Sequence, residues 1–168
     1  MLSNFDLEQI AEYYKVPLLG VVMKDELPPF VRDGSYIINL QSTTDGNGSH
    51  WTALQVKGNS AFFFDSFGAP PSTEIVEYTK QRSGCHIGFN NWIIQDLKSE
   101  NCGYYALGLL IYINKNLKTS NLFKVGNDYI DGFTGDTKHN DRLLRSFYRK
   151  NTEGTIPPLI NRLLKQKK

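Results

Sequence analysis

One of the two cysteines stands directly before the most apolar stretch of the chain. Cys102-Gly103 precedes the run from Tyr104 to Ile113, which predicts a buried helix with the thiol in its first turn. The free N–H groups and the positive dipole end of a helix start favour the thiolate, and Gly103 would let a substrate carbonyl approach the backbone. A free cysteine is also commonly a small buried side chain, so this segment alone leaves both interpretations open.

His50 is the histidine whose surroundings suit a catalytic base. It precedes a predicted strand, and a second strand ends at Asp65, with Gly58-Asn59 as the loop between them. A two-residue loop with glycine first is typical of an antiparallel hairpin, and it sets Thr52 opposite Asp65. His50 shares a face with Thr52, so Asp65 lies on its diagonal, roughly 7–8 Å away between backbones. The register therefore predicts a histidine–carboxylate pair at the open end of the hairpin.

A cysteine nucleophile also needs a donor for the oxyanion. Residues 92–94 predict a short buried strand ending at Gln95, and the next loop leads into Cys102. The Gln95 amide and the Cys102 backbone N–H could then donate to one carbonyl oxygen from two sides. Each residue also has an ordinary interpretation: a core thiol, a solvated histidine, a carboxylate that ends a strand, and a polar strand end. The combination favours cysteine catalysis.

The order of these residues resembles the adenovirus protease (adenain) family, especially its relatives in virophages and in Maverick/Polinton mobile elements. The similarity covers roughly residues 2–114. The motifs that carry it are Gly48-Ser49-His50-Trp51, Phe64-Asp65-Ser66-Phe67-Gly68, Gln95 seven positions before Cys102-Gly103, Leu18-Leu19-Gly20 and Pro28-Pro29-Phe30-Val31.

The resemblance implies a role for each residue. Cys102 would be the nucleophile, His50 the general base, Asp65 its orienting acid and Gln95 the oxyanion donor. The implied activity is that of a cysteine endopeptidase that cleaves viral structural (capsid) precursors at Gly-containing sites during virion maturation. Such an enzyme would work in the virion or the host cell interior, with no metal and no required cofactor.

Two departures keep other functions open. Adenoviral members usually carry Glu at the position of Asp65, whereas proteases of ubiquitin-like modifiers use Asp there. Those proteases, however, place Gln six positions before Cys, which commonly follows Asp, and this chain has seven positions and Asn101. The loop length favours adenain. A protease that removes ubiquitin-like modifiers is one alternative, and a non-catalytic capsid or DNA-binding protein with the same fold is another.

The resemblance also implies two kinds of activator. Cys85 lies near the position where adenoviral members carry a cysteine that can form a disulfide with an activating peptide, although a loop-like Ser83-Gly84-Cys85-His86 also suits an inert surface thiol. Adenain uses DNA as a cofactor. The net charge of +2 is low for a dedicated nucleic-acid-binding domain, so a solvated helical face is the favoured interpretation of the C-terminal basic residues. These residues are Arg142, Arg145, Arg149, Lys150, Arg162, Lys165, Lys167 and Lys168.

Length and patterning indicate one compact domain over residues 1–168. No apolar run approaches the ~20 residues that span a bilayer, and the first residues lack the features of a signal peptide. We therefore expect a soluble protein that is not secreted and has no membrane partner, in a reducing compartment that suits a catalytic thiol.

The expected fold class is α+β, a mixed or antiparallel central sheet packed against the Cys102 helix, as in adenain, ubiquitin-like-modifier proteases and the papain-like superfamily. Ser3 to Asp6 matches a capping box, residues 36–40 predict a strand beside the hairpin, and Ser72 is expected to cap a helix. Two amphipathic helices follow near the end of the chain, with Leu143, Leu144, Phe147 and Tyr148 in the first and Leu159, Ile160, Leu163 and Leu164 in the second.

Overall fold

The computed structural model describes residues 1–119 and 121–167. Its strands are β1 (Leu18–Met23), β2 (Gly34–Asn39), β3 (Trp51–Lys57), β4 (Ser60–Phe64) and β5 (His86–Phe89). Its α-helices are α1 (Asn4–Tyr13), α2 (Thr73–Lys80), α3 (Cys102–Asn116), α4 (Leu122–Asp131), α5 (Thr137–Asn151) and α6 (Pro158–Leu164), with short 3-10 turns η1 (Lys24–Glu26) and η2 (Leu117–Thr119). The described residues include no helix long and apolar enough to cross a membrane.

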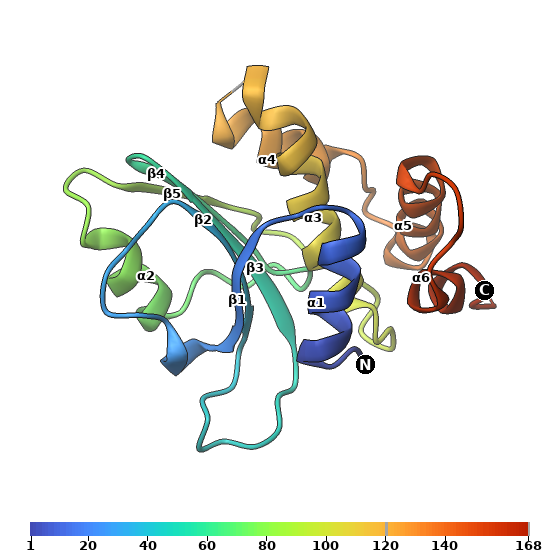
Figure 1. Ribbon diagram of the computed structural model, residues 1–168, viewed down its shortest axis with the longest axis horizontal. Helices are drawn as coiled ribbons and strands as arrows, with labels where there is room; N and C mark the ends of the chain where they lie inside the picture. The colour runs from blue at the N-terminus through green and yellow to red at the C-terminus, as the bar shows by residue number, and fades with distance from the viewer. Residues whose placement is uncertain (120, 168) are drawn as a thin grey trace.

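The strands form one mixed sheet in the order β1-β2-β3-β4-β5. The outer pairs, β1 with β2 and β4 with β5, are parallel, and the inner pairs are antiparallel. Helix α2 covers one face of the sheet, and α1 and α3 lie on the other, with α5 and α6 beyond them (Figure 1). This arrangement confirms the expected α+β class with a mixed sheet.

The β3–β4 hairpin has the predicted register. Lys57 pairs with Ser60, and the pairing continues to Ala53 with Phe64. Gly58 has φ 57°, whereas Asn59 is not among the residues with positive φ, which is the pattern of a turn that needs glycine only at its first central position. The turn therefore fixes which residues lie opposite one another at the open end of the hairpin.

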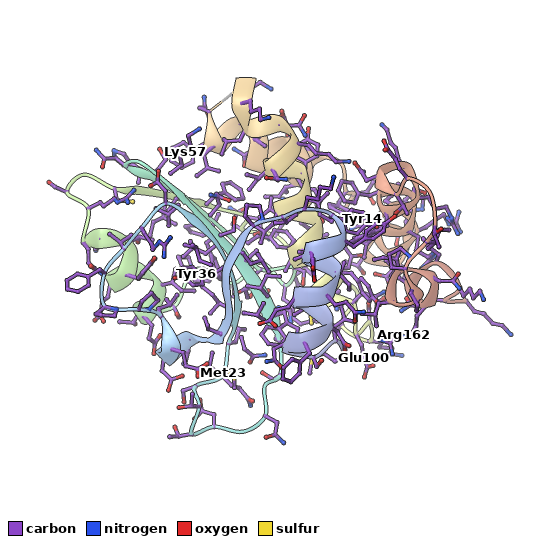
Figure 2. The ribbon with its side chains drawn as sticks, viewed as in Figure 1. Tyr14, Met23, Tyr36, Lys57, Glu100 and Arg162 are labelled. Carbon is purple, nitrogen blue, oxygen red and sulfur yellow. The ribbon has the colours of Figure 1, made fainter. Side chains whose placement is uncertain are left out.

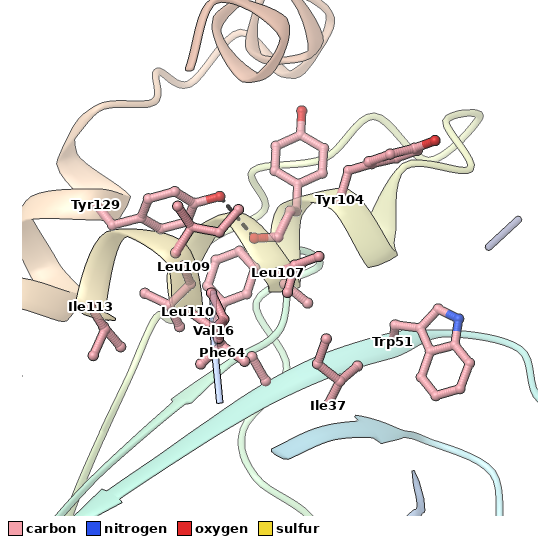
Figure 3. Packing of buried hydrophobic residues seen from close by; sticks show 14 of the residues in the cluster. Val16, Ile37, Trp51, Phe64, Tyr104, Leu107, Leu109, Leu110, Ile113 and Tyr129 are labelled. Atoms are coloured by element: carbon pink, nitrogen blue, oxygen red, sulfur yellow. Dashed lines mark hydrogen bonds between the residues drawn. The ribbon is translucent and has the colours of Figure 1, made fainter. Parts of the chain in front are cut away.

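Helix α3 is the centre of the larger core. Every residue from Asn101 to Ile111 is buried, which explains why this segment is apolar all round rather than amphipathic. The hydroxyl of Tyr129 on α4 donates to the carbonyl of Tyr105 at 2.8 Å, so the polar end of this buried ring is satisfied (Figure 3). Tight packing on all sides holds the N-terminal end of α3 in one position against the sheet.

The N-terminal helix α1 contacts the C-terminal part of the chain. The capping box predicted at Ser3 and Asp6 is present, with both reciprocal hydrogen bonds. Tyr14, at the other end of α1, shares a 2.6 Å hydrogen bond with Thr152 after α5 and lies between α1 and the C-terminal helices (Figure 2). The predicted C-terminal stripes of α5 and α6 face the larger core, with one half of their residues buried and the other half partly buried against it. Pro158 occupies the first turn of α6.

Two local predictions were wrong. Residues 92–94 form no strand: Ile93 is 46% exposed, and the amides of Ile94 and Gln95 donate to the Ser66 carbonyl instead of to a strand neighbour. Residues 83–85 lie in the expected loop, and β5, at one edge of the sheet, begins at His86, which pairs with Ser60. Ser72 does precede α2, but its hydroxyl makes no capping hydrogen bond.

Candidate active site

His50 and Asp65 form the predicted pair at the open end of the hairpin. His50 directly precedes β3 and Asp65 directly follows β4. The Nε2 atom of His50 lies 2.7 Å from Oδ1 of Asp65, and the two residues are 6% and 1% exposed. A buried charge-assisted hydrogen bond of this length can fix the orientation of the imidazole ring.

The turn after β4 and one asparagine hold this pair in place. The Phe67 amide donates to Oδ1 of Asp65 at 2.8 Å, and the Phe67 ring stacks on His50 with centroids 4.4 Å apart and planes inclined by 15°. Asn90 accepts from the Asp65 amide and donates to the Asp65 carbonyl at 2.6 Å. Sequence reasoning gave Phe67 no role of its own beyond its place in a motif, and no single-sequence signal marked Asn90.

Cys102 is the first residue of α3 and is 3% exposed. Because Nε2 of His50 is bonded to Asp65, Nδ1 is the ring nitrogen that remains for the thiol. Asn101 precedes the helix but makes no capping bond, since its side-chain oxygen accepts from Nε2 of Gln166 at 2.9 Å. Its side-chain nitrogen donates to Asp141 at 3.3 Å and to Gln166 at 2.8 Å. The first N–H groups of α3 are therefore not occupied by a side-chain cap, as an anion site at a helix start requires.

Electrostatics favour a protonated His50. Burial of the ring lowers its pKa, but hydrogen bonds to Asp65 and to Cys102, together with their negative charges, outweigh the burial and raise the pKa of His50 to about 9. The imidazolium is thus the preferred form at neutral pH, and it can stabilise a thiolate at Cys102.

Gln95 is fully buried in the segment that leads to Cys102. Its Oε1 accepts from the Ser66 hydroxyl at 2.6 Å, and its Nε2 donates to the Ser99 carbonyl at 2.6 Å. The carbonyl of Ser99 fixes which end of the amide carries the hydrogens, because a carbonyl can only accept. One N–H of Gln95 remains after this bond, and its convergence with the Cys102 amide stays a prediction.

Gly103 also has a packing role. A Cβ at this position would lie 3.1 Å from Leu7, 3.2 Å from Leu2 and 3.4 Å from Trp51. The missing side chain therefore lets α3 approach α1 and the tryptophan after His50. The approach of a substrate carbonyl to this backbone stays a prediction. The Trp51 indole also donates to the Leu2 carbonyl at 2.8 Å.

A cavity of about 450 Å³ adjoins this region. Its lining includes Gly48 and Trp51, which stand before and after His50 in sequence, residues 1–4, and Met23 from β1. Its size falls within the range of ligand pockets. Among the described residues, no three His, Cys, Asp or Glu side chains gather in a way that could hold a metal ion.

Cys85 lies apart from these contacts, immediately before β5. It is half-buried and free, and burial raises the pKa of its thiol. Its surroundings therefore do not activate it, in contrast to the helix start and imidazole at Cys102.

The chain is similar to several solved structures. The ASFV pS273R protease has a TM-score of 0.52 and 17% identity over 88% of this chain and 66% of that chain. A Se-Met structure of the same protease has a TM-score of 0.41 and 19% identity, over 66% of this chain and 43% of that chain. AvrA delL154 with IP6 and CoA has a TM-score of 0.45 and 20% identity, over 96% of this chain and 65% of that chain. No protein-family model and no curated protein matches the chain.

The first of these likenesses concerns the fold, because the identity is low. It confirms the expected architecture, in which a mixed sheet packs against a helix that begins at Cys102. The chain spans about two thirds or less of the length of the three structures.

Proposed function

We propose that this protein is a cysteine endopeptidase with Cys102 as nucleophile, His50 as general base and Asp65 as the acid that orients it. The observation that carries the proposal is the 2.7 Å bond from Nε2 of His50 to buried Asp65, which leaves the other ring nitrogen for the thiol at the start of α3. The same three roles define cysteine and serine hydrolases on unrelated folds.

The proposed reaction follows from this arrangement. The Cys102 sulfur attacks the peptide carbonyl carbon and forms a C–S bond, while negative charge on the oxygen is met by the Cys102 amide and by Gln95. The C–N bond then breaks as imidazolium His50 gives its proton to the leaving amine. Water, deprotonated by His50, hydrolyses the thioester and returns thiolate and imidazolium.

The proposed substrates are viral structural precursors, cleaved at Gly-containing sites during virion maturation. This part rests on the motifs around His50, Asp65 and Cys102 and on the shared fold with a protease from ASFV. A location in the virion or host cell interior, a relationship to the virophage and Maverick type, and activation by a peptide at Cys85 or by DNA belong to the same proposal. The cavity beside Trp51 is the proposed place for substrate residues.

Removal of ubiquitin-like modifiers is a second candidate. It is favoured by one observation, the aspartate at position 65, whose short side chain reaches His50 directly in this structure. Incubation of the enzyme with capsid precursors and with modifier conjugates separates the two activities. Cleavage of the conjugates alone would favour the second candidate.

The nucleophile is tested by selective alkylation. Iodoacetamide at neutral pH should label Cys102 well before Cys85, because only Cys102 has an imidazolium and a helix start beside it. Cys102→Ala should abolish cleavage without unfolding the chain, and Cys85→Ser is the matched control that should keep basal cleavage. Equal labelling of both thiols, or full activity of Cys102→Ala, would contradict the assignment.

A further inference from the structure

A second cavity of about 560 Å³ opens between residues 96–99, the N-terminal half of α5 and Lys167. Its volume is within the range of sites for small organic ligands. It shares no lining residue with the proposed catalytic set or with the cavity beside Trp51. The cavity therefore needs an explanation of its own.

Cations dominate its lining. Its lining contains five lysine and arginine residues, one histidine and three carboxylates. The cations are Lys98, Lys138, Arg142, Arg145 and Lys167, the histidine is His139, and the carboxylates are Asp96, Asp136 and Asp141. Each carboxylate is already bonded elsewhere: Asp96 accepts from the Lys98 amide, and Asp136 accepts from the amides at the start of α5. Among the described residues, none of these carboxylates forms an ion pair with a lysine or arginine of the lining.

Arg145 is the most unusual of these cations. It is only 6% exposed, and in the described part of the chain its guanidinium has no hydrogen bond and no ion pair. None of its nitrogens is completely buried, so the charge can be reached from the cavity. Its natural partner is Asp141, one helical turn earlier. That carboxylate is instead taken by the Tyr105 hydroxyl at 2.7 Å and by Ser99 and Asn101 at 3.3 Å each.

A buried cation without a partner is costly, and an anion in the cavity would offset that cost. A guanidinium is suited to phosphate because its planar fork can donate two parallel hydrogen bonds to two oxygens. The surrounding lysines would meet further negative charges of the same molecule. A compact polyanion fits a concave site with a buried arginine better than nucleic acid does, since the phosphates of nucleic acid follow an exposed surface.

We propose that this cavity binds a small, multiply phosphorylated molecule, such as an inositol polyphosphate or a nucleoside triphosphate, with Arg145 as its buried anchor. The geometry also connects the cavity to the loop before the proposed nucleophile. Ser99 and Asp141 line the cavity, and they accept hydrogen bonds from Gln95 and from Asn101, respectively. Occupancy should therefore order residues 95–101. An effect on turnover rests on the proposed protease function, whereas binding does not.

Calorimetric titration of the full chain tests the site. The probes are inositol hexakisphosphate, ATP without magnesium, orthophosphate and a single-stranded DNA oligonucleotide, and a preference between the first two identifies the source of the phosphates. Arg145→Gln should raise the dissociation constant of the preferred probe at least about tenfold, because hydrogen bonds to charged groups are among the strongest. Lys150→Gln removes an exposed charge from the same helix outside the cavity and should change it by no more than about twofold.

Folding and activity are separated from binding by further variants. Without a probe, Arg145→Gln should melt at the same or a higher temperature, since it removes an unpaired buried charge. If it fails to fold, the exposed pair Lys98→Gln and Lys138→Gln gives the same test. Binding should persist in Cys102→Ala, so failure of the proposed protease function leaves this result intact. Binding of DNA alone, equal weakening by Lys150→Gln, or no binding of either polyphosphate would overturn the proposal.

Discussion

At the scale of single residues, the site is a connected set of hydrogen bonds around one turn. Asp65 is hydrogen-bonded to His50. The next residue, Ser66, donates from its hydroxyl to the side chain of Gln95, and its carbonyl accepts from the amides of Ile94 and Gln95. One turn thus links the proposed base to the proposed oxyanion donor. Individual substitutions separate these roles.

If Asp65 is the orienting acid, as proposed, it should set the alkaline limit of activity. Asp65→Asn keeps the shape and can still accept from His50 and Phe67, but it removes the charge that raises the pKa of His50 to about 9. The alkaline limb of kcat/KM should therefore move from about pH 9 toward 6.5, the ordinary value for histidine, and the rate should fall by about 10²–10⁴-fold. Asp65→Glu is the control, with measurable turnover expected. An unchanged alkaline limb would contradict this role.

The two interpretations of Gln95, oxyanion donor and polar packing residue, predict different kinetics. As an oxyanion donor it acts only when charge develops on the carbonyl, so Gln95→Ala should lower kcat by about 10²-fold or more with KM nearly unchanged. Ser66→Ala is the matched control, because it removes the bond that holds Gln95 without removing the donor itself. A Gln95→Ala enzyme with normal kcat and lowered stability would assign the residue to packing.

At the scale of elements, the hairpin and α3 bring together residues that are far apart in sequence. The two-residue turn fixes the register of β3 with β4. The burial of α3 fixes the position of Cys102, its first residue. The segment from Asp65 to Gln95 contains a close approach of two backbone stretches, at Gly68 and Trp92. A Cβ at Gly68 would lie 2.7 Å from the Trp92 backbone, and its φ is 77°.

Glycine is therefore required at position 68 for two reasons, conformation and space. Gly68→Ala should destabilise the protein by about 1–3 kcal/mol through backbone strain and clash, and it should lower activity by displacing the turn that carries Asp65. Gly58→Ala has a positive φ of 57° but no neighbour within 4 Å, so it should cost about 1 kcal/mol and keep activity. Urea unfolding and kcat/KM measure both effects. Equal loss of activity in both variants would contradict the positional argument.

At the scale of the whole molecule, α5 connects the C-terminal half to the proposed active site. Asn140 donates to the Ile94 carbonyl, and Asp141 accepts from Tyr105 and Asn101. The loop before Cys102 is thus held between the sheet on one side and α5 on the other. The last third of the chain, which carries no family motif, is part of what positions the site.

Global stability should depend on pH through His50. Its pKa is about 9 in the folded protein against 6.5 for an ordinary histidine, so its contribution is fully present below pH 6.5 and is lost as pH rises to about 9. That contribution corresponds to about 3 kcal/mol. Urea unfolding of the native protein and of His50→Gln between pH 6 and 10 measures it, and the difference between the two should shrink across this window. Parallel curves would mean that His50 is not stabilised by Asp65.

The sequence by itself determined the elements whose signals are local. Gly58-Asn59 specified the hairpin turn, the apolar run specified α3, and the alternation of side chains along a paired strand then placed His50 near Asp65. The joint order of His50, Asp65, Gln95 and Cys102 suggested the chemistry. These inferences succeed because turn geometry and helix burial depend on residues close together in sequence.

Only the tertiary structure decided the contacts between distant segments. Four such features depend on which surfaces meet after folding. They are the bond from Asn90 to the Asp65 backbone, the exposure of Ile93, the edge strand β5, and the packing of Gly103 against Leu2 and Trp51. The unpaired Arg145 is the clearest example, because a sequence pattern of Asp141 and Arg145 predicts a helical ion pair. The Asp141 carboxylate instead accepts hydrogen bonds from Tyr105, Ser99 and Asn101, which lie outside α5. The spacing of residues within α5 cannot predict these competing contacts.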